Sequence, residues 1–178
     1  MTTDRIGTDI DDGIARVVLD NPGRKNALTL GMWHALAATC RDLADNPEVR
    51  AVVLTGRGAA FSAGADVTEF PTARKTPEQT LEYSEICQAA TDAILALPVP
   101  VIAEIRGPCL GAGAAIALCA DLRYLAEDAS FGIPAAKLGL AYEPRWIARM
   151  IETLGLPVAS ELLLTARAFG AEAHRTER

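Results

Sequence analysis

The sequence predicts an α/β fold, in which strand patterns and helix patterns alternate along the chain. After an opening pair of strand patterns, apolar runs of strand length are followed by stretches with apolar residues at helical spacing. Two loops that follow buried strand patterns are rich in glycine and alanine. The chain has 178 residues, of which 50% are hydrophobic, and this is enough to bury the core of one domain. We therefore expect a single domain over residues 1–178.

The first elements are two strand patterns, Arg5 to Ile10 and Ile14 to Leu19, joined by Asp11-Asp12-Gly13. An Asp-Gly pair favours a tight hairpin turn, so these strands should be antiparallel. Asn21-Pro22-Gly23 then ends the second strand. From Thr29 to Ala44 the apolar residues recur at helical spacing, which predicts a helix.

The next elements continue the alternation. The apolar run Ala51 to Leu54 predicts a strand that is buried on both faces. Thr76-Pro77-Glu78-Gln79 combines an N-cap, a first-turn proline and a capping-box glutamine, and apolar residues follow at helical spacing as far as Leu97. Further strands are expected at Pro100 to Ile105 and Leu122 to Leu125, and further helices at Pro144 to Leu154 and Val158 to Thr165.

The stretch Gly107 to Asp121 follows an apolar strand pattern and consists mainly of small residues. Small side chains let a ligand reach backbone amides directly, and the unpaired N–H groups of a first helical turn favour a phosphate or an oxygen that becomes anionic. A second small-residue turn, Phe61 to Asp66, also follows a strand pattern. Two such turns can face one ligand, so we expect a site built from backbone.

Composition excludes several classes of function. The formal net charge of −6 argues against nucleic acid as the main partner. The small-apolar run Cys109 to Ala120 is too short to span a bilayer, and Met1 to Ile10 lacks the apolar block of a signal peptide, so we expect a cytoplasmic protein that does not bind membranes. Neither a metal site nor disulfides are expected, because the cysteines are irregularly spaced in apolar surroundings; they are Cys40, Cys87, Cys109 and Cys119.

Four segments, in order, resemble the crotonase (enoyl-CoA hydratase/isomerase) family. They are Asn26-Ala27-Leu28, Ala51 to Gly56, Ala60 to Asp66 and Gly107 to Asp121, and the resemblance covers roughly Ile14 to Gly170. No Walker lysine and no strict Gly-x-Gly-x-x-Gly points to a nucleotide instead. The resemblance implies a crotonase-like spiral of ββα units that binds acyl-CoA or enoyl-CoA thioesters and stabilises an enolate. Coenzyme A would enter as part of the substrate, with no tightly bound cofactor.

The resemblance also implies roles for particular residues. The backbone N–H groups of Ala65 and Ala112 would form an oxyanion hole for the thioester carbonyl oxygen. The family usually has glycine at the position of Ala112, and alanine should cost little there if it begins a helix. The residues implied to line the groove for coenzyme A are Asn26, Ala27, Leu28, Ala63, Ala65, Asp66 and Val67, with Arg24 or Lys25 near its phosphates. From its own setting, Asp66 is expected to cap the next turn.

Two residue positions argue against hydration. Hydratases of this family supply two glutamates, and the matching positions here are Ala115 and Ala135, whose methyl groups cannot transfer protons. Peroxisomal-type enoyl-CoA isomerases, and the ring-epoxide isomerase of phenylacetate breakdown, have an acidic residue a few positions after a Leu-Gly-like pair. Counted through Leu138-Gly139, that position is Glu143. A single carboxylate is enough to move a proton between two carbons while an oxyanion hole holds the dienolate.

The sequence therefore leads to an enoyl-CoA isomerase with Glu143 as base, and leaves open a non-catalytic acyl-CoA-binding protein of the same fold. Glu143 precedes a proline at a helix start, so a capping role is the alternative to catalysis. Trp146 either walls an acyl pocket or fills the core. Packing or solvent roles are expected for His34, His174, Cys109 and Cys119.

The C-terminus is shorter than the resemblance implies. Family members continue beyond the region matching Phe169-Gly170 with helices that cover the acyl pocket and pack between the subunits of trimers or paired trimers. This sequence ends at Arg178 without that helical segment. We expect the apolar surface that the segment would cover to be buried by self-association into a homo-oligomer.

Overall fold

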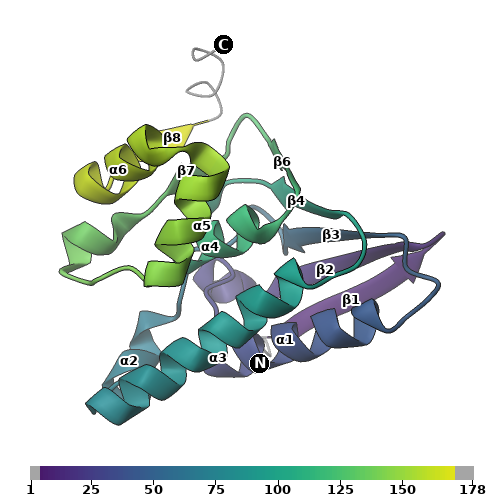
Figure 1. The fold of residues 1–178 in the computed structure, drawn as a ribbon, viewed down its shortest axis with the longest axis horizontal. Helices are drawn as coiled ribbons and strands as arrows, with labels where there is room; N and C mark the ends of the chain where they lie inside the picture. The colour runs from purple at the N-terminus through teal and green to yellow at the C-terminus, as the bar shows by residue number, and fades with distance from the viewer. Residues whose placement is uncertain (1–4, 171–178) are drawn as a thin grey trace.

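The computed structural model describes residues 5–170, and these residues form a mixed α/β fold (Figure 1). A five-stranded sheet has the order β1-β2-β3-β4-β6, with strands at Arg5–Asp11, Ile14–Asp20, Ala51–Gly56, Val101–Ile105 and Leu122–Leu125. The β1–β2 pair is the expected antiparallel hairpin, and the pairs that follow it across the sheet are parallel. The predicted strands are therefore confirmed.

Two long helices lie side by side along the sheet (Figure 1). Helix α1 (Leu30–Ala44) begins after Thr29, whose side chain accepts a hydrogen bond from Met32 N–H. Helix α3 (Pro77–Leu95) begins with the capping box that the sequence predicts: Thr76 and Gln79 each accept a hydrogen bond from the other's backbone N–H. These two caps fix the helix starts, and one apolar face of each helix packs into the core.

Among residues 5–170, β3 is fully buried on one face and only partly buried on the other, so the expectation that it is buried on both faces is wrong. Val52 and Leu54 are fully buried, whereas Ala51 and Val53 alternate with them and are partly exposed. The less covered face carries polar groups instead, since Arg16 of β2 reaches across β3 and donates a 2.7 Å hydrogen bond to Glu104 of β4. An unbroken apolar run did not distinguish a doubly covered strand from a strand with one partly exposed face.

A smaller sheet lies at the opposite end of the molecule from the β1–β2 turn (Figure 1). Its order is β5-β7-β8, with strands at Pro108–Leu110, Ser130–Gly132 and Ala168–Gly170. Helices α5 (Pro144–Leu154) and α6 (Leu156–Thr165) pack together beside it. The bounds of α5 agree with the prediction, and α6 begins before the predicted start. The three short strands were not predicted, because each is too short to show a periodic pattern.

Short elements complete the connections between strands and helices. They are η1 (Pro22–Arg24), η2 (Val67–Glu69), α2 (Phe70–Ala73), α4 (Ala112–Cys119) and η3 (Pro134–Leu138). The central helix α4 is buried at every position, and the core of the molecule continues through it into α3 and α5. Within residues 5–170, no helix is long and apolar enough to cross a membrane.

Candidate active site

The two small-residue turns meet in space. Ser62 N–H donates to Pro108 O and Leu110 N–H donates to Ser62 O, each at 2.9 Å, which joins the loop after β3 to strand β5. A Cβ atom added to Gly64 would lie 2.9 Å from Leu110 O and 3.4 Å from Ala112 N. Glycine is required at position 64 by this close approach, and its φ of +104° is also one that other residues avoid. The two turns are therefore neighbours in space and line one pocket, and that they face one ligand stays a prediction.

Free backbone amides lie at the two positions that the sequence singled out. Gly64 N–H donates to Ser62 Oγ at 3.1 Å, and Asp66 N–H donates to Leu28 O at 2.8 Å. Between them, the Ala65 N–H has no acceptor among the residues that the structure describes. Ala112 is the first residue of α4, where an N–H has no intrahelical partner, and no other described group accepts from it.

The backbone before α4 explains why alanine is accepted at position 112. Gly111 takes φ 52° and ψ −116°, a conformation that is ordinary for glycine and unfavourable for other residues, and its N–H donates to Gly132 O at 2.9 Å. The residue with positive φ is therefore the glycine, while Ala112 lies outside the positive-φ region. This agrees with the expectation that a methyl group at the helix start costs little.

Ala65 and Ala112 line one pocket, which encloses about 820 Å³ including the part that opens to solvent. Its wall comes from the loop after β3, from α2, α3, the start of α4, and the segment from η3 to α5. Most lining residues are small or apolar, and two are charged, Arg74 and Glu143. An apolar pocket with few polar groups is typical of a site for a small molecule.

Glu143 occupies the N-cap position of α5, but its side chain does not cap that helix. Its carboxylate Oε2 instead accepts a hydrogen bond from Ser84 Oγ of α3, and its backbone oxygen accepts from Ile147 N–H at 3.0 Å. The side chain is partly buried and lines the pocket. The capping alternative for this carboxylate is therefore not supported by the structure.

Two aromatic residues next to Glu143 complete this wall of the pocket. The Tyr142 hydroxyl donates a 2.9 Å hydrogen bond to Gly111 O, and burial raises the pKa of Tyr142 well above its ordinary value. Trp146 Nε1 donates to Thr91 Oγ1 at 3.3 Å, and its ring stacks on Trp33 with centroids 6.0 Å apart. Trp146 thus lines the pocket and also packs against the core, and that the pocket holds an acyl group stays a prediction.

The positions that carry glutamates in hydratases hold no carboxylate here. Ala135 lines the pocket within η3, and Ala115 is buried in α4, with 2% of its surface exposed. Glu143 is the one acidic residue among the residues that line this pocket. Acid–base chemistry at this site therefore has a single carboxylate to use.

The residues proposed to line a groove for coenzyme A divide into two groups. Ala63, Ala65 and Val67 line the pocket. Asn26 is fully buried, and its amide nitrogen donates to Arg57 O at 2.9 Å and to Ala60 O at 2.7 Å. Ala27 and Leu28 are also buried. Asn26 and Leu28 hold the loop after β3 in place, so their contact with coenzyme A stays a prediction.

The charged residues of this region are also placed. Asp66 caps η2 as expected, since its Oδ1 accepts from Thr68 N–H at 3.1 Å. Arg24 forms an ion pair of 3.1 Å with the same carboxylate and donates to Thr68 Oγ1, and both Arg24 and Lys25 are exposed. Both cations face solvent, and their contact with the phosphates of coenzyme A stays a prediction.

The remaining candidates have structural positions. His34 lies on the exposed side of α1, and His174 falls outside the described residues. Cys109 and Cys119 are buried without a disulfide, and burial raises the pKa of the Cys119 thiol to about 12. The sequence did not indicate Ser84, Tyr142 or Arg74 as site residues, because their place in the pocket depends on contacts between segments that are separated in the chain.

The fold and the two facing turns define a class: α/β proteins whose small-molecule pocket is built around free backbone amides. The chain belongs to the enoyl-CoA hydratase/isomerase family, whose sequence profile matches residues 9–176. It spans about two thirds of the length of the relatives described below.

Known proteins resemble the chain over nearly its whole length. A probable enoyl-CoA hydratase of Mycobacterium tuberculosis is 35% identical over 167 residues, which is 94% of this chain and 65% of that protein. The peroxisomal Delta(3,5)-Delta(2,4)-dienoyl-CoA isomerase of Arabidopsis thaliana is 31% identical over 183 residues, which cover 97% of this chain and 66% of that protein. The crystal structure of an enoyl-CoA hydratase/carnithine racemase from Magnetospirillum magneticum superposes with a TM-score of 0.95 at 36% identity. The superposition covers 99% of this chain and 66% of that one.

Proposed function

We propose that this protein binds acyl-CoA thioesters and moves the double bond of an enoyl-CoA, with Glu143 as the base. One observation carries the proposal: a carboxylate and the two free amides lie in the wall of the same pocket. Family membership supports a thioester as the ligand, since the relatives are described as acting on enoyl-CoA or dienoyl-CoA.

In the proposed reaction, the N–H groups of Ala65 and Ala112 hold the thioester carbonyl oxygen. Removal of a proton from C2 converts that oxygen to an enolate oxygen, so negative charge develops where the two donors lie. Each donor of this kind is typically worth about 3 kcal/mol in the transition state, because the amide is already oriented. Backbone amides suit this role, since the surrounding loops fix their positions through the hydrogen bonds of Gly64, Asp66 and Gly111.

Glu143 moves the proton. Its carboxylate takes a proton from C2 of a 3-enoyl-CoA, the electrons spread over a dienolate, and the same proton returns at C4 to give the 2-enoyl-CoA. Ser84 donates to one carboxylate oxygen and leaves the other available for the substrate proton. One base is enough, because the reaction neither adds nor removes a proton overall.

Hydration is not the reaction we propose, although the Mycobacterium tuberculosis relative is described as a probable hydratase. Adding water to a double bond calls for acid and base groups around one water molecule, and the two family positions for them are Ala115 and Ala135. Positioned acid–base groups contribute about a hundred- to ten-thousandfold each. Without both of them, hydration should be negligible.

The proposal is tested by incubating the protein with a 3-enoyl-CoA and, separately, with a 2-enoyl-CoA. We expect the first to become conjugated and the second to gain no water. Hydration of the 2-enoyl-CoA at a rate similar to isomerisation would contradict the assignment. Binding of both thioesters without turnover would instead favour the non-catalytic acyl-CoA-binding alternative.

A further inference from the structure

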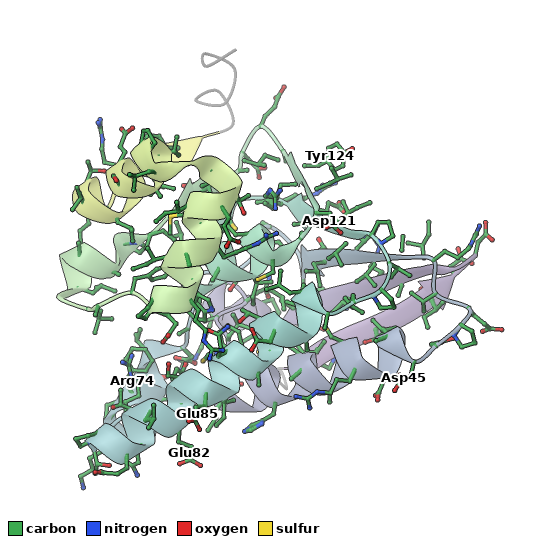
Figure 2. All side chains as sticks on the ribbon, in the orientation of Figure 1. Asp45, Arg74, Glu82, Glu85, Asp121 and Tyr124 are labelled. Atoms are coloured by element: carbon green, nitrogen blue, oxygen red, sulfur yellow. The ribbon has the colours of Figure 1, made fainter. Side chains whose placement is uncertain are left out.

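Arg74 places a positive charge in the wall of the pocket, opposite in sign to Glu143. It follows α2, and its guanidinium lies over the ring of Phe70, 4.8 Å from the ring centroid, and 5.7 Å from the centroid of Tyr83. Phe70 and Tyr83 meet edge to face, with centroids 5.7 Å apart. Figure 2 shows Arg74 near α2, on the side of the molecule where α3 begins. The two rings hold the cation in place through cation–π attraction.

The guanidinium of Arg74 has no partner of opposite charge among residues 5–170. Three arginines in this range are partly buried, namely Arg74, Arg123 and Arg149. Arg123 donates to three backbone oxygens, and Arg149 donates to Leu118 O and pairs with Glu152. Of the three, only the Arg74 guanidinium donates to neither a carboxylate nor a backbone carbonyl among the described residues. A partly buried guanidinium normally finds such a partner, because it gives up hydration on burial.

The position of Arg74 relative to Glu143 follows from α3. The Arg74 backbone oxygen accepts a hydrogen bond from Thr80 Oγ1 at 3.5 Å, and Ser84, which holds Glu143, lies one helical turn further along. One turn of helix is about 5.4 Å. Arg74 and Glu143 line the same pocket, and among the described residues they form no ion pair with each other, so both charges remain available to a ligand.

We infer that this pocket is selective for acyl-CoA thioesters whose acyl group ends in a carboxylate, which Arg74 binds. The inference rests on the proposed function, because it takes the pocket to hold the acyl group of a thioester. A guanidinium binds a carboxylate through two parallel hydrogen bonds, which gives both strength and orientation. The rings of Phe70 and Tyr83 and the side chains of Leu138 and Leu140 would surround the carbons between the two ends.

The alternative anion is a phosphate of coenzyme A. The carboxylate is favoured because Arg74 shares its wall with aromatic and aliphatic residues, which suit an acyl chain better than a strongly hydrated diphosphate. The net charge of −6 also works against attraction of any extra negative charge by the molecule as a whole. A preference for a carboxylate would therefore have to come from a local contact.

Calorimetric titration with two saturated thioesters of equal chain length tests the inference without requiring catalysis. Glutaryl-CoA ends in a carboxylate, and pentanoyl-CoA ends in a methyl group. We expect the wild-type protein to bind glutaryl-CoA about tenfold more tightly than pentanoyl-CoA, as is typical of a charge-assisted pair. Arg74→Met, which keeps the side chain over Phe70, should remove the preference, and Arg74→Lys should keep part of it. Arg41→Met is the matched control, because Arg41 is exposed on α1, away from the pocket residues.

Equal binding of both thioesters by the wild type would overturn this inference and leave the proposed function intact. A preference that survives in Arg74→Met would also overturn it. If Arg74→Met weakens the binding of both thioesters equally, Arg74 contacts coenzyme A and the inference is wrong. If the folded wild type binds neither thioester, the proposed function itself fails, and the selectivity fails with it.

Discussion

The Tyr142 hydroxyl donates a 2.9 Å hydrogen bond to Gly111 O, and this oxygen belongs to the same peptide unit as the Ala112 N–H. A hydrogen bond to the carbonyl of a peptide unit fixes its plane and polarises its N–H. Tyr142 is also the residue before Glu143, so adjacent residues contact the proposed oxyanion donor and supply the proposed base. The short segment before α5 therefore positions both parts of the proposed site.

The first prediction is that Tyr142→Phe lowers kcat about tenfold while leaving KM nearly unchanged. In the wild type the rings of Tyr142 and Trp146 have centroids 5.4 Å apart, and a phenyl ring keeps this packing. The substitution removes only the hydrogen bond to the Gly111–Ala112 peptide. The Ala112 N–H then donates less effectively to the charge that develops in the transition state. Steady-state kinetics on a 3-enoyl-CoA measures this effect.

A spectroscopic readout separates positioning from general packing. The carbonyl stretching frequency of a bound thioester should rise in Tyr142→Phe, because the oxygen is held by a weaker donor. Tyr124→Phe is the control, since Tyr124 is exposed on β6 (Figure 2). Wild-type kinetics and an unchanged carbonyl frequency in Tyr142→Phe would show that this hydrogen bond has no part in catalysis.

Much of the fold could be predicted from local sequence signals. The capping box at Thr76, the Asp12-Gly13 turn and the small-residue turn before Ala112 each specify their structure through neighbours a few residues away. The short strands β5, β7 and β8 could not be predicted, because they exist only through pairing between distant segments. The partly exposed face of β3 was missed for a similar reason: local hydrophobicity does not report which helices cover a sheet.

The candidate site divides in the same way. Ala65, Ala112 and Glu143 could be proposed as site residues from the sequence, because the residues around them match motifs of a family. Ser84, Tyr142 and Arg74 were not found, because a serine, a tyrosine and an arginine are common at helix surfaces and loops. Their meaning lies in the hydrogen bonds from Ser84 to Glu143 and from Tyr142 to Gly111, which join residues far apart in sequence.

The second prediction concerns stability at alkaline pH. Burial raises the pKa of the thiols of Cys40, Cys87 and Cys119 from 9.0 to about 12. Between these two values the unfolded chain has lost thiol protons that the folded chain keeps, so the free energy of unfolding falls as the pH rises. Each thiol contributes a fall of about 1.4 kcal/mol per pH unit within that window.

Urea denaturation from neutral pH to above pH 9 measures this slope. Cys40→Ala should make the fall shallower, because one of the titrating thiols is then absent. Cys40 has no exposed surface, so this variant will also be less stable at neutral pH, and the comparison is therefore of slopes rather than of absolute values. A slope in Cys40→Ala equal to that of the wild type would contradict the assignment to buried thiols.

The third prediction is that the chain forms a homo-oligomer at micromolar concentration. Large apolar side chains are exposed near the pocket and on the C-terminal helices; they are Leu138, Leu140, Ile151, Leu156 and Leu164. Leu164 on α6 has 82% of its surface exposed. Apolar surface of this kind is usually buried in an interface.

Light scattering during size-exclusion chromatography measures the mass in solution. Leu164→Gln should shift the protein toward a smaller species, while Leu81→Gln, at an exposed leucine of α3, serves as the matched control. A wild-type protein that elutes as a well-folded monomer would show that the exposed leucines do not drive assembly.

The central claim is that Glu143 transfers the proton, and one substitution tests it most directly. Glu143→Gln keeps the shape of the side chain and can still accept the hydrogen bond from Ser84, but its amide cannot take a proton from carbon. We expect the rate of conversion of a 3-enoyl-CoA to the conjugated 2-enoyl-CoA to fall about a hundred- to ten-thousandfold, with the affinity for a saturated acyl-CoA unchanged. Glu85→Gln, at an exposed glutamate of α3 (Figure 2), should leave both quantities at their wild-type values. An isomerisation rate in Glu143→Gln equal to that of the wild type would contradict the assignment of Glu143 as the base.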